Sequence, residues 1–383
     1  MTGEATLRPT GEAELCELIA DAAARGERLS LGGGGSKSDI GRPLADARPV
    51  DLSGFTGVVD YDPPELVLTV RPGAPLADVQ ALVAAEGQML AFEPFDHGPL
   101  FGRPAGAATI GGVVAAGVSG SQRLAFGAAR DHLLGVRAVS GRGEMFVGGA
   151  KVVKNVTGYD LPKLIAGSWG RLAAITELTL KVLPAPRVAA TRVLAGLDPA
   201  AAVEAMAAAM GSQADVACAA HLPGRTPITA FRLQGFPGSV AARCETLAQR
   251  LKAFGDLSDA GGEGAAIWTS LRTLEPLPRV APLWRISAPP SQGAAVAATL
   301  EREGAPWLMD WAGGLVWTAF EGEASRLRET ARNAGGHAQL VRASAATRSA
   351  TPAFHPPAAG VAALETRVRR AFDPAGVFET GRF

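Results

Sequence analysis

The stretch RLSLGGGGSKSD, at residues 28–39, most constrains what this chain can fold into, because four consecutive glycines follow a short apolar run. Glycine has no Cβ, so this backbone can take positive φ angles and approach a ligand closely. A P-loop needs glycine directly before Lys-Ser, but Ser36 precedes Lys37. The Gly-x-Gly-x-x-Gly fingerprint of dinucleotide-binding βαβ units would place a glycine at Lys37 or Ser38 and then a helix. Both motifs are therefore excluded.

The glycine run itself allows two interpretations. Isolated glycine runs are weak indicators, so the simpler interpretation is a flexible hairpin loop. The alternative is a strand–loop–strand segment in which successive exposed N–H groups form a nest for an anion. The hydroxyl and the ammonium that follow the glycines would add a donor and a cation, and this combination suits a pyrophosphate. The residues expected to bind it are Gly32, Gly33, Gly34, Gly35, Ser36 and Lys37.

A second glycine-rich segment, TIGG at 109–112, opens an apolar, alanine-rich stretch that predicts a helix. The first N–H groups of a helix are free and this end carries a partial positive charge, so an anion can bind there. Close packing of the helix on a sheet would also favour glycine, and this alternative stays open. A third segment, at 157–176, predicts a polar loop, a short helix, a glycine turn and a strand.

The rest of the chain alternates predicted helices and strands. Apolar residues at helical spacing predict a helix at 12–25, which Gly26 ends. A strand at 172–186 ends in prolines, and these mark the predicted boundary between domains. The sequence therefore predicts an α+β fold with one domain at 1–186 and a second at 187–383. Further helices are predicted at 75–87, 199–210 and 239–254, and further strands at 28–31, 47–55, 65–73, 133–149, 228–236, 283–289 and 313–320.

Composition excludes several classes of function. Lys plus Arg and Asp plus Glu number 37 each, so the chain has no excess positive charge for nucleic acid or an anionic membrane. No run of about 18 apolar residues is present, so no transmembrane segment is expected. Cys16, Cys218 and Cys244 predict no disulfide framework and are too few for a four-thiolate iron–sulfur cluster. We expect a soluble cytoplasmic protein with no metal site, whose membrane contact would be peripheral.

In this order and spacing, the three glycine-containing segments resemble the FAD-binding domain of the vanillyl-alcohol-oxidase type, also called the PCMH type, over residues 1–186. The resemblance implies two α+β lobes, here followed by a C-terminal α+β domain. It implies FAD with its pyrophosphate on the glycine loop, held non-covalently because the loop lacks the histidine that attaches flavin in some members. One departure is GSWGRLAAIT at 167–176, where the family commonly has GSEGTLGIIT. Further FAD-binding residues implied by the resemblance are Thr109, Ile110, Gly111, Gly112, Ser119, Gly120, Gly170 and Ile175.

A narrower likeness covers both halves of the chain. The segments LAFEPFDHGPLFG, PLWRISAPPS, GGHAQLVRA and VRRAFDPAGVFETGRF are similar to those of the FAD-binding subunits of bacterial glycolate oxidases. The resemblance implies a complex with a larger FAD-containing catalytic subunit and an iron–sulfur subunit. Such a complex oxidises glycolate, and often D-lactate, to the 2-oxo acid. Its contact with the inner face of the cell membrane would be peripheral, and the C-terminal domain is expected to be substrate-domain-like or a subunit interface.

Residues suited to oxidising a 2-hydroxy acid are sparse in this sequence. Such chemistry needs a group that binds the substrate carboxylate and a base close to the flavin. Arg285 is a candidate for the carboxylate, with a structural ion pair as the alternative. His337 is a candidate base, with a packed histidine at a strand end as the alternative. The H-x-G-D-G-N-x-H pattern of related 2-hydroxy-acid dehydrogenases is absent.

Three functions therefore remain open. The first is an FAD-binding subunit that serves electron relay or assembly in a glycolate-oxidising complex, and the missing metal-ligand pattern favours it. The second is a self-sufficient FAD-dependent dehydrogenase of 2-hydroxy acids, and the third is a flavin fold that no longer binds FAD. A docked partner needs an apolar surface, and LMDWAGGLVW at 308–317 is a candidate. The alternative is that Trp311 and Trp317 belong to the core.

Overall fold

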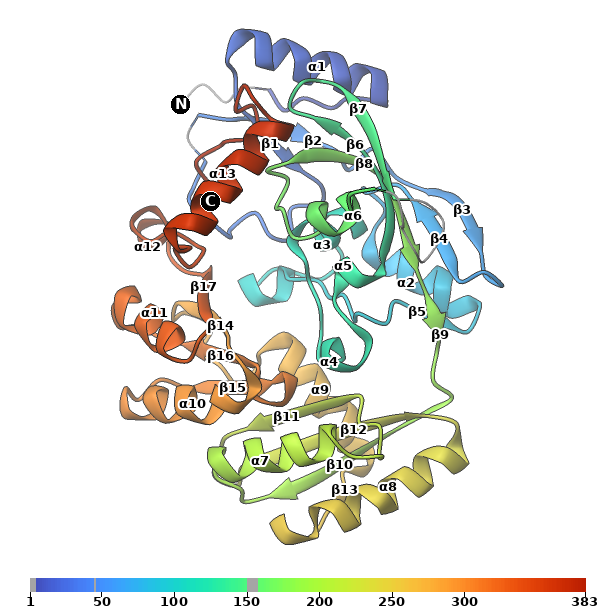
Figure 1. Ribbon diagram of the computed structural model, residues 1–383, viewed down its shortest axis with the longest axis vertical. Coiled ribbons are helices and arrows are strands. Elements are labelled where there is room, and N and C mark those ends of the chain that lie inside the picture. Colours follow the sequence, from blue (N-terminus) through green and yellow to red (C-terminus); the bar gives the residue numbers. More distant parts are fainter. Residues whose placement is uncertain (1–4, 45, 150–157) are drawn as a thin grey trace.

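The computed structural model describes residues 5–44, 46–149 and 158–383 (Figure 1). Each half of the chain contains one large β-sheet, with five strands in the first half and eight in the second. Helices and strands are mixed throughout, which confirms the predicted α+β class. The polar loop predicted at the start of the third glycine-containing segment lies largely outside the described residues.

Helix α1 (Glu12–Arg25) has the bounds that the sequence predicts. One face packs on the strands that follow it, and Gly26 ends the helix at φ +67, in the left-handed conformation that glycine adopts without strain. The buried residues of this face are Leu15, Ile19 and Ala22.

The glycine run follows the first of two parallel strands. β1 (Leu29–Gly32) pairs with β2 (Arg48–Asp51), and Leu31 lies opposite Val50. A hairpin joins antiparallel strands, whereas parallel neighbours need a longer crossover. The hairpin interpretation of the glycine run is therefore wrong, and the run instead begins a long connection between the two strands.

The second lobe of the first half is an antiparallel sheet with the strand order β3–β4–β8–β6–β7. The edge strand β3 is absent from the sequence prediction. It leaves Val58 and Val59 half exposed, so it has no alternating apolar pattern to reveal it. The elements of this lobe and its flanks are β3 (Val58–Asp62), β4 (Val67–Val70), α2 (Leu76–Ala85), β5 (Gln88–Met89), α3 (Ile110–Ala116), α4 (Arg123–Phe126), α5 (Ala129–His132), β6 (Leu133–Ser140), β7 (Met145–Gly149), α6 (Leu161–Ile165), β8 (Ala173–Lys181) and β9 (Leu183–Pro184).

The second half forms an antiparallel sheet with the order β13–β10–β12–β11–β15–β16–β14–β17. Helices α7, α8, α10 and α11 cover one face, with an apolar core beneath them. On the other face, Leu308 and Trp317 pack with Ile40 and Leu100 of the first half. The elements are β10 (Val188–Ala195), α7 (Pro199–Met210), β11 (Cys218–Leu222), β12 (Ile228–Gly235), α8 (Pro237–Leu251), β13 (Ser258–Asp259), α9 (Gly264–Thr273), β14 (Leu283–Ser287), α10 (Gly293–Arg302), β15 (Trp307–Asp310), β16 (Leu315–Ala319), α11 (Ala324–Asn333), β17 (His337–Arg342) and α12 (Ala345–Ala350).

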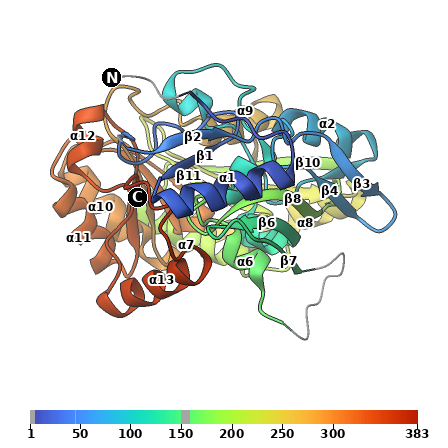
Figure 2. The same cartoon turned by 90° about the horizontal axis from the view of Figure 1, so that it is seen from above.

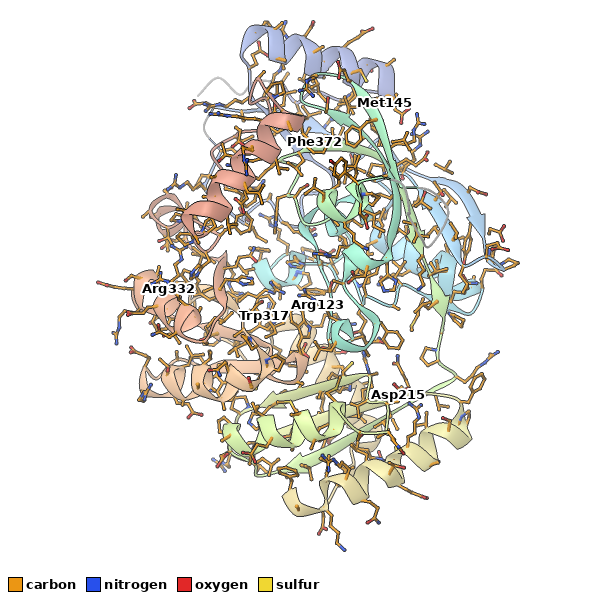
Figure 3. The ribbon with its side chains drawn as sticks, viewed as in Figure 1. Arg123, Met145, Asp215, Trp317, Arg332 and Phe372 are labelled. Carbon is orange, nitrogen blue, oxygen red and sulfur yellow. The ribbon has the colours of Figure 1, made fainter. Side chains whose placement is uncertain are left out.

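These elements confirm most of the sequence prediction for the second half. The helix predicted at 199–210 is α7, and the strands predicted at 228–236, 283–289 and 313–320 are β12, β14 and β16. The interface prediction for LMDWAGGLVW is wrong, because Trp311 and Trp317 are buried between the two halves of this chain. Figure 3 shows Trp317 and Arg123 in the band where the two halves meet.

The end of the chain returns to the first half. Helix α13 (Ala359–Phe372) places the ring of Phe372 5.6 Å from that of Phe146, centroid to centroid, and Val377 joins the core under α1. Figure 1 shows this red segment beside α1 and β1, and Figure 2 shows α10 to α13 together on one side of the molecule. In chain order, β8 is the last strand of the five-stranded sheet and β10 is the first strand of the eight-stranded sheet. The division of the chain into domains at residue 186 stays a prediction.

Candidate functional site

A cavity of about 480 Å³ lies in the first half, between the two lobes and the end of the chain. This volume lies within the range of cofactor and ligand sites, which is roughly 300–1,000 Å³. All six residues of the predicted pyrophosphate loop line it, so the structure brings the loop together with most of the other predicted FAD-binding residues. The other predicted FAD-binding residues in the cavity wall are Thr109, Gly111, Gly112, Gly170 and Ile175.

The glycine loop offers unpaired donors to this cavity. In the part of the chain that the structure describes, no hydrogen bond uses the backbone N–H of any residue from Gly33 to Lys37. Pairing resumes at Ser38, whose N–H donates to the carbonyl of Gly35 at 3.0 Å. Gly35 has φ +76, a conformation in which other residues are strained. A run of free N–H groups at the wall of a cavity is an arrangement that binds phosphate oxygens.

Two of the loop glycines are required by packing within the protein. A Cβ on Gly33 would lie 2.7 Å from the hydroxyl oxygen of Thr109, and a Cβ on Gly34 would overlap the carbonyl group of Ala107. The first and second glycine-rich segments therefore pack directly against each other. This contact fixes the loop beside the start of α3 before any ligand binds.

The start of α3 has no free N–H groups to offer among its first residues. Ile110 N–H donates to the carbonyl of Ala74 at 3.0 Å, and Gly111 N–H donates to that of Pro72 at 2.8 Å. The N–H of Gly112 donates to the side chain of Thr109 at 3.2 Å. The expectation of free donors here is therefore wrong. This segment therefore forms part of the cavity wall without offering hydrogen-bond donors from these three residues. The side chain of Ile110 lies in the core.

Gly111 and Gly112 have different surroundings. A Cβ on Gly111 would overlap Pro72, so close packing explains this glycine. A Cβ on Gly112 would meet only the Thr109 hydroxyl at 3.2 Å, so packing within the protein does not require a glycine there. Gly112 is therefore the position at which an added side chain would enter the cavity.

Lys37 brings a buried cation to the same wall. Its ammonium donates to the hydroxyl of Ser36 at 3.3 Å and makes no ion pair with any described residue. Burial lowers the pKa of Lys37 to about 8, and the negative charge of Asp96 opposes the shift. A buried ammonium without a paired carboxylate is suited to an anionic ligand.

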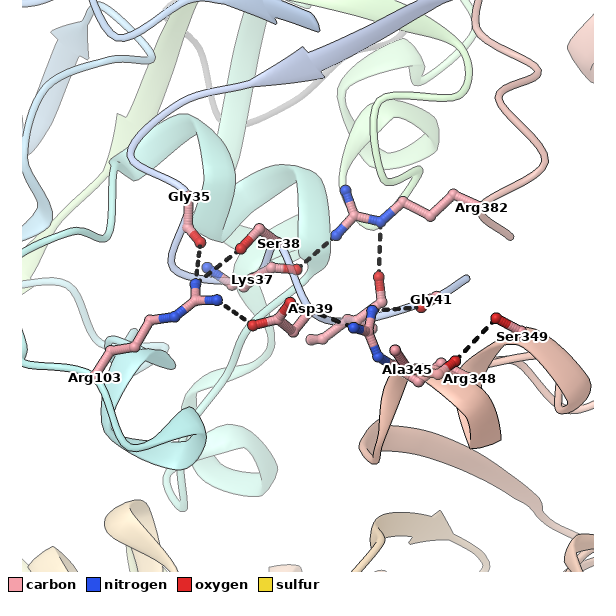
Figure 4. Close-up of polar contacts among 11 residues, drawn as sticks. Gly35, Lys37, Ser38, Asp39, Gly41, Arg103, Ala345, Arg348, Ser349 and Arg382 are labelled. Carbon is pink, nitrogen blue, oxygen red and sulfur yellow. Dashed lines mark hydrogen bonds and ion pairs between the residues drawn. The ribbon is translucent and has the colours of Figure 1, made fainter. Parts of the chain in front are cut away.

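Three arginines from distant segments hold the chain after the glycines (Figure 4). Arg103 donates to the carbonyl of Gly35 at 3.2 Å, to the Ser38 hydroxyl at 2.8 Å, and to Asp39. Arg348 donates to the carbonyl of Gly41 at 3.1 Å and to Asp39 at 3.5 Å. Arg382 donates to the carbonyls of Lys37 and Ile40 at 2.8 and 2.7 Å. The sequence analysis missed all three, because only the fold brings them to the loop.

An aromatic group closes one side of the cavity. The ring centroid of Phe383 lies 5.0 Å from that of Trp169 and 4.9 Å from that of Phe354. Trp169 and Phe383 both line the cavity. Trp169 occupies the GSWG departure from the family pattern, so this departure places an indole next to the end of the chain.

Ser119 and Gly120 lie outside this cavity, in the wall of a smaller one of about 40 Å³. There the second half closes onto the first. The hydroxyl of Ser121 donates to Asp310 at 2.7 Å, and the indole N–H of Trp311 donates to the carbonyl of Gly120 at 3.0 Å. Arg232 and Glu93 form an ion pair at 2.6 Å across the same interface.

The two candidate catalytic residues lie on neighbouring strands of the second sheet. Arg285 of β14 lies opposite Gln339 of β17, and Ser287 lies opposite His337. The two candidates are therefore offset by two residues along the paired strands. The guanidinium carbon of Arg285 lies 4.9 Å from the ring centroid of Trp311. His337 starts β17 and is exposed, and nearby protein together with the charge of Arg285 lowers its pKa.

In residues 5–44, 46–149 and 158–383, no three side chains of His, Cys, Asp or Glu are grouped so that they could bind a metal ion. No helix among those residues has both the length and the hydropathy to cross a membrane.

Comparisons with known proteins agree with this geometry. The FAD binding domain family matches residues 3–149. The fold is similar to that of p-cresol methylhydroxylase, with a TM-score of 0.69 at 14% identity, over 98% of this chain and 88% of that one. The glycolate oxidase subunit GlcE of Escherichia coli (strain K12) is 35% identical over 374 residues, 96% of each chain. A D-lactate dehydrogenase of Anaerostipes hadrus is 37% identical over 36% of this chain and 27% of its own length.

The matched family, the relatives and the fold thus define an FAD-dependent oxidoreductase with a PCMH-type FAD-binding domain. Within this class, the chain belongs to the family of the glycolate oxidase subunit GlcE. Its likeness to the D-lactate dehydrogenase covers only about a third of this chain.

Proposed function

We propose that the cavity binds FAD without a covalent bond. The free N–H groups from Gly33 to Lys37 carry the proposal, and the Lys37 ammonium supports it, because a pyrophosphate needs several donors and a positive charge. When bound, FAD supplies the capacity to accept a hydride from a substrate. The residues of this cavity proposed to contact it are Gly32, Gly33, Gly34, Gly35, Ser36, Lys37, Thr109, Gly111, Gly112, Gly170 and Ile175. Further proposed contacts are the backbone of Ile110 and, in the wall of the smaller cavity, Ser119 and Gly120.

The proposed role is that of the FAD-binding subunit of a complex that oxidises glycolate to glyoxylate, with this chain serving electron relay or assembly. The likeness to GlcE along almost the whole chain supports this role. The proposed partners are a larger FAD-containing catalytic subunit and an iron–sulfur subunit. The proposed location is the cytoplasm, with peripheral contact to the inner face of the membrane through the complex. The absence of a disulfide between any of the three described cysteines is consistent with that location.

Flavin occupancy and dye reduction test this role together. The purified chain is expected to bind FAD and to reduce a dye with glycolate only when the partner subunits are added. A chain that never takes up FAD would contradict the cofactor proposal. Rapid glycolate oxidation by the isolated chain would instead favour a self-sufficient dehydrogenase of 2-hydroxy acids, with Arg285 and His337 as its candidate catalytic residues.

A further inference from the structure

Trp169 lies in the wall of the proposed FAD cavity, on a turn with a left-handed backbone. Its φ angle is +57, between Gly167 at +80 and Gly170 at +72. A residue with a side chain adopts this conformation at a cost, and residues of this kind gather at ligand sites. The backbone N–H of Trp169 donates to the carbonyl of Ala115 at 2.8 Å, so the turn is fixed on α3. The fold therefore holds an indole at the cavity wall by means of a strained backbone.

Three aromatic side chains from separate segments meet at this wall. The ring centroid of Trp169 lies 5.0 Å from that of Phe383 and 5.7 Å from that of Phe354, and the two phenylalanine centroids are 4.9 Å apart. Trp169 and Phe383 line the cavity and are only partly buried. Their rings therefore still have apolar surface to offer a ligand.

The ligand proposed for this cavity has two flat rings of different chemistry. Adenine and isoalloxazine lie on opposite sides of the pyrophosphate of FAD, so with the pyrophosphate on the glycine loop only one of them can extend toward the aromatic group. A ring that stacks on an aromatic side chain gains free energy beyond the area that it buries. The indole is the most electron-rich of the aromatic side chains, and isoalloxazine is more electron-poor than adenine. Stacking on Trp169 therefore favours isoalloxazine.

The course of α3 shows which end of the cavity the aromatic group occupies. Gly112, in the first turn of the helix, and Ala116, at its end, both line the cavity. The chain then continues to Gly120, in the wall of the smaller cavity where the two halves meet. Trp169 is bonded to Ala115, in the last turn of α3. The aromatic group therefore lies at the end of the cavity that is closer to the second half.

The same group joins the core between the two halves. Trp169 and Phe383 pack against a cluster that includes Leu100 of the first half and Leu308 of the second. Ligand sites occur preferentially between domains, and a flavin ring in this position is close to a surface that a substrate or a partner can reach. Adenine takes no part in electron transfer and has no such requirement.

We propose that the indole of Trp169 stacks on the isoalloxazine ring of FAD, with Phe383 beside it. The inference rests on the proposed function, since it places one ring of the cofactor that the cavity is proposed to bind. It adds the orientation of FAD in the cavity and the side chains that set this orientation, neither of which follows from the glycine loop. An indole in contact with isoalloxazine transfers an electron to the excited flavin and quenches its emission, so the contact has an optical signature.

Titration of the apo chain with FAD, together with the emission of the bound flavin, tests the stacking. Trp169→Leu should weaken FAD binding by about tenfold, because a stacked ring is lost. Flavin bound to the wild type should fluoresce weakly, and flavin bound to Trp169→Leu should fluoresce strongly. Trp169→Phe keeps a ring without the quenching, so it should keep most of the affinity and still gain emission. ADP, which carries the adenine half alone, should bind to the wild type and to Trp169→Leu equally.

Phe236→Leu is the matched control, because Phe236 is an exposed aromatic residue of the second half, with 70% of its surface accessible. It should equal the wild type in FAD affinity and in flavin emission. Melting temperatures of all variants show whether each one is folded, and Trp169→Phe still gives the emission test if Trp169→Leu does not fold.

Separate outcomes distinguish this inference from the proposed function. If the wild type binds FAD and the emission of the bound flavin is the same in all three proteins with a residue change at Trp169 or none, the inference is wrong while the FAD proposal stands. If Trp169→Leu weakens ADP binding as much as FAD binding, the indole contacts adenine and the inference is again wrong. If the wild type binds no FAD, the proposed function fails and the inference fails with it.

Discussion

Arg382 donates a hydrogen bond to the backbone carbonyl of Lys37 at 2.8 Å, across 345 residues of chain. Its Nε donates to the carbonyl of Ile40 at 2.7 Å, so one guanidinium group holds both ends of a short segment. The end of the chain therefore fixes the conformation in which the loop presents its donors to the cavity.

We expect Arg382→Met to weaken FAD binding by about tenfold, because losing hydrogen bonds from a charged group costs roughly 1.5–3 kcal/mol. The loop would then have to be ordered by the ligand. Fluorescence titration with FAD gives the dissociation constant. Arg370→Met, at an exposed arginine of α13, is the control, because this guanidinium makes no hydrogen bond to the described residues of the loop. Equal FAD affinity in the two variants would show that Arg382 does not order the loop.

Gly112 and Gly34 should respond differently to a larger side chain. Gly112→Leu adds bulk toward the cavity without a backbone clash, so FAD occupancy should fall while the melting temperature of the apo chain changes little. Gly34→Ala would collide with the backbone of Ala107, so the free energy of unfolding should fall by about 1–3 kcal/mol. Thermal melts and flavin absorbance measure both effects.

Gly360→Leu is the control for this pair, since a Cβ at this position on α13 meets nothing within 4 Å. It should keep both FAD and stability. If Gly112→Leu retains FAD at the wild-type affinity, the cavity does not hold the cofactor where we place it.

The candidate site divides into a part that the sequence predicts and a part that it does not. The glycine loop was predictable, because a run of glycines followed by Ser36 and Lys37 restricts the local backbone to a few functions. The arginines that hold this loop were not, because Arg103, Arg348 and Arg382 reach it only through the tertiary fold. Their sequence contexts resemble those of any surface arginine.

The start of α3 lines the cavity, but not for the reason that the sequence suggests. The TIGG segment does line the cavity through Thr109, Gly111 and Gly112. Its N–H groups, however, are satisfied by Pro72, Ala74 and the Thr109 side chain, and local spacing cannot reveal such partners. The left-handed backbone of Trp311 and Ala312, with φ angles of +52 and +53, was equally hidden, since a tryptophan in an apolar run predicts core burial and nothing more.

The buried Lys37 should make the stability of the apo chain depend on pH. Its pKa is about 8 in the folded state, below the ordinary value of 10.5, so the unfolded chain binds more protons between these two values. The free energy of unfolding should therefore rise with pH from 8 to about 10.5, by up to about 3 kcal/mol, relative to Lys37→Met. Urea unfolding of both proteins across this range measures the difference. A constant difference between them would mean that the Lys37 ammonium is not desolvated.

FAD should reverse this behaviour, because a pyrophosphate beside Lys37 stabilises its charged form and raises its pKa. The rise in stability above pH 8 should then shrink or disappear in the FAD-loaded chain. Lys37→Met should bind FAD more weakly at pH 7 and lose less affinity than the wild type as the pH rises to 10. If added FAD leaves the pH dependence of the wild type unchanged, Lys37 does not contact the phosphates.

The isolated chain should bind FAD and still oxidise glycolate negligibly. The cavity supplies donors for the cofactor, whereas the sequence lacks the H-x-G-D-G-N-x-H pattern of related dehydrogenases, and three cysteines cannot ligate a four-thiolate cluster to carry electrons onward. Dye reduction with glycolate should therefore appear only after the partner subunits are added. In that complex, Gly112→Leu should lower the rate, because this chain would carry no FAD, and Gly360→Leu should not. Full activity of a complex that holds the FAD-free variant would limit this chain to assembly, and glycolate turnover by the chain alone would make it a complete dehydrogenase.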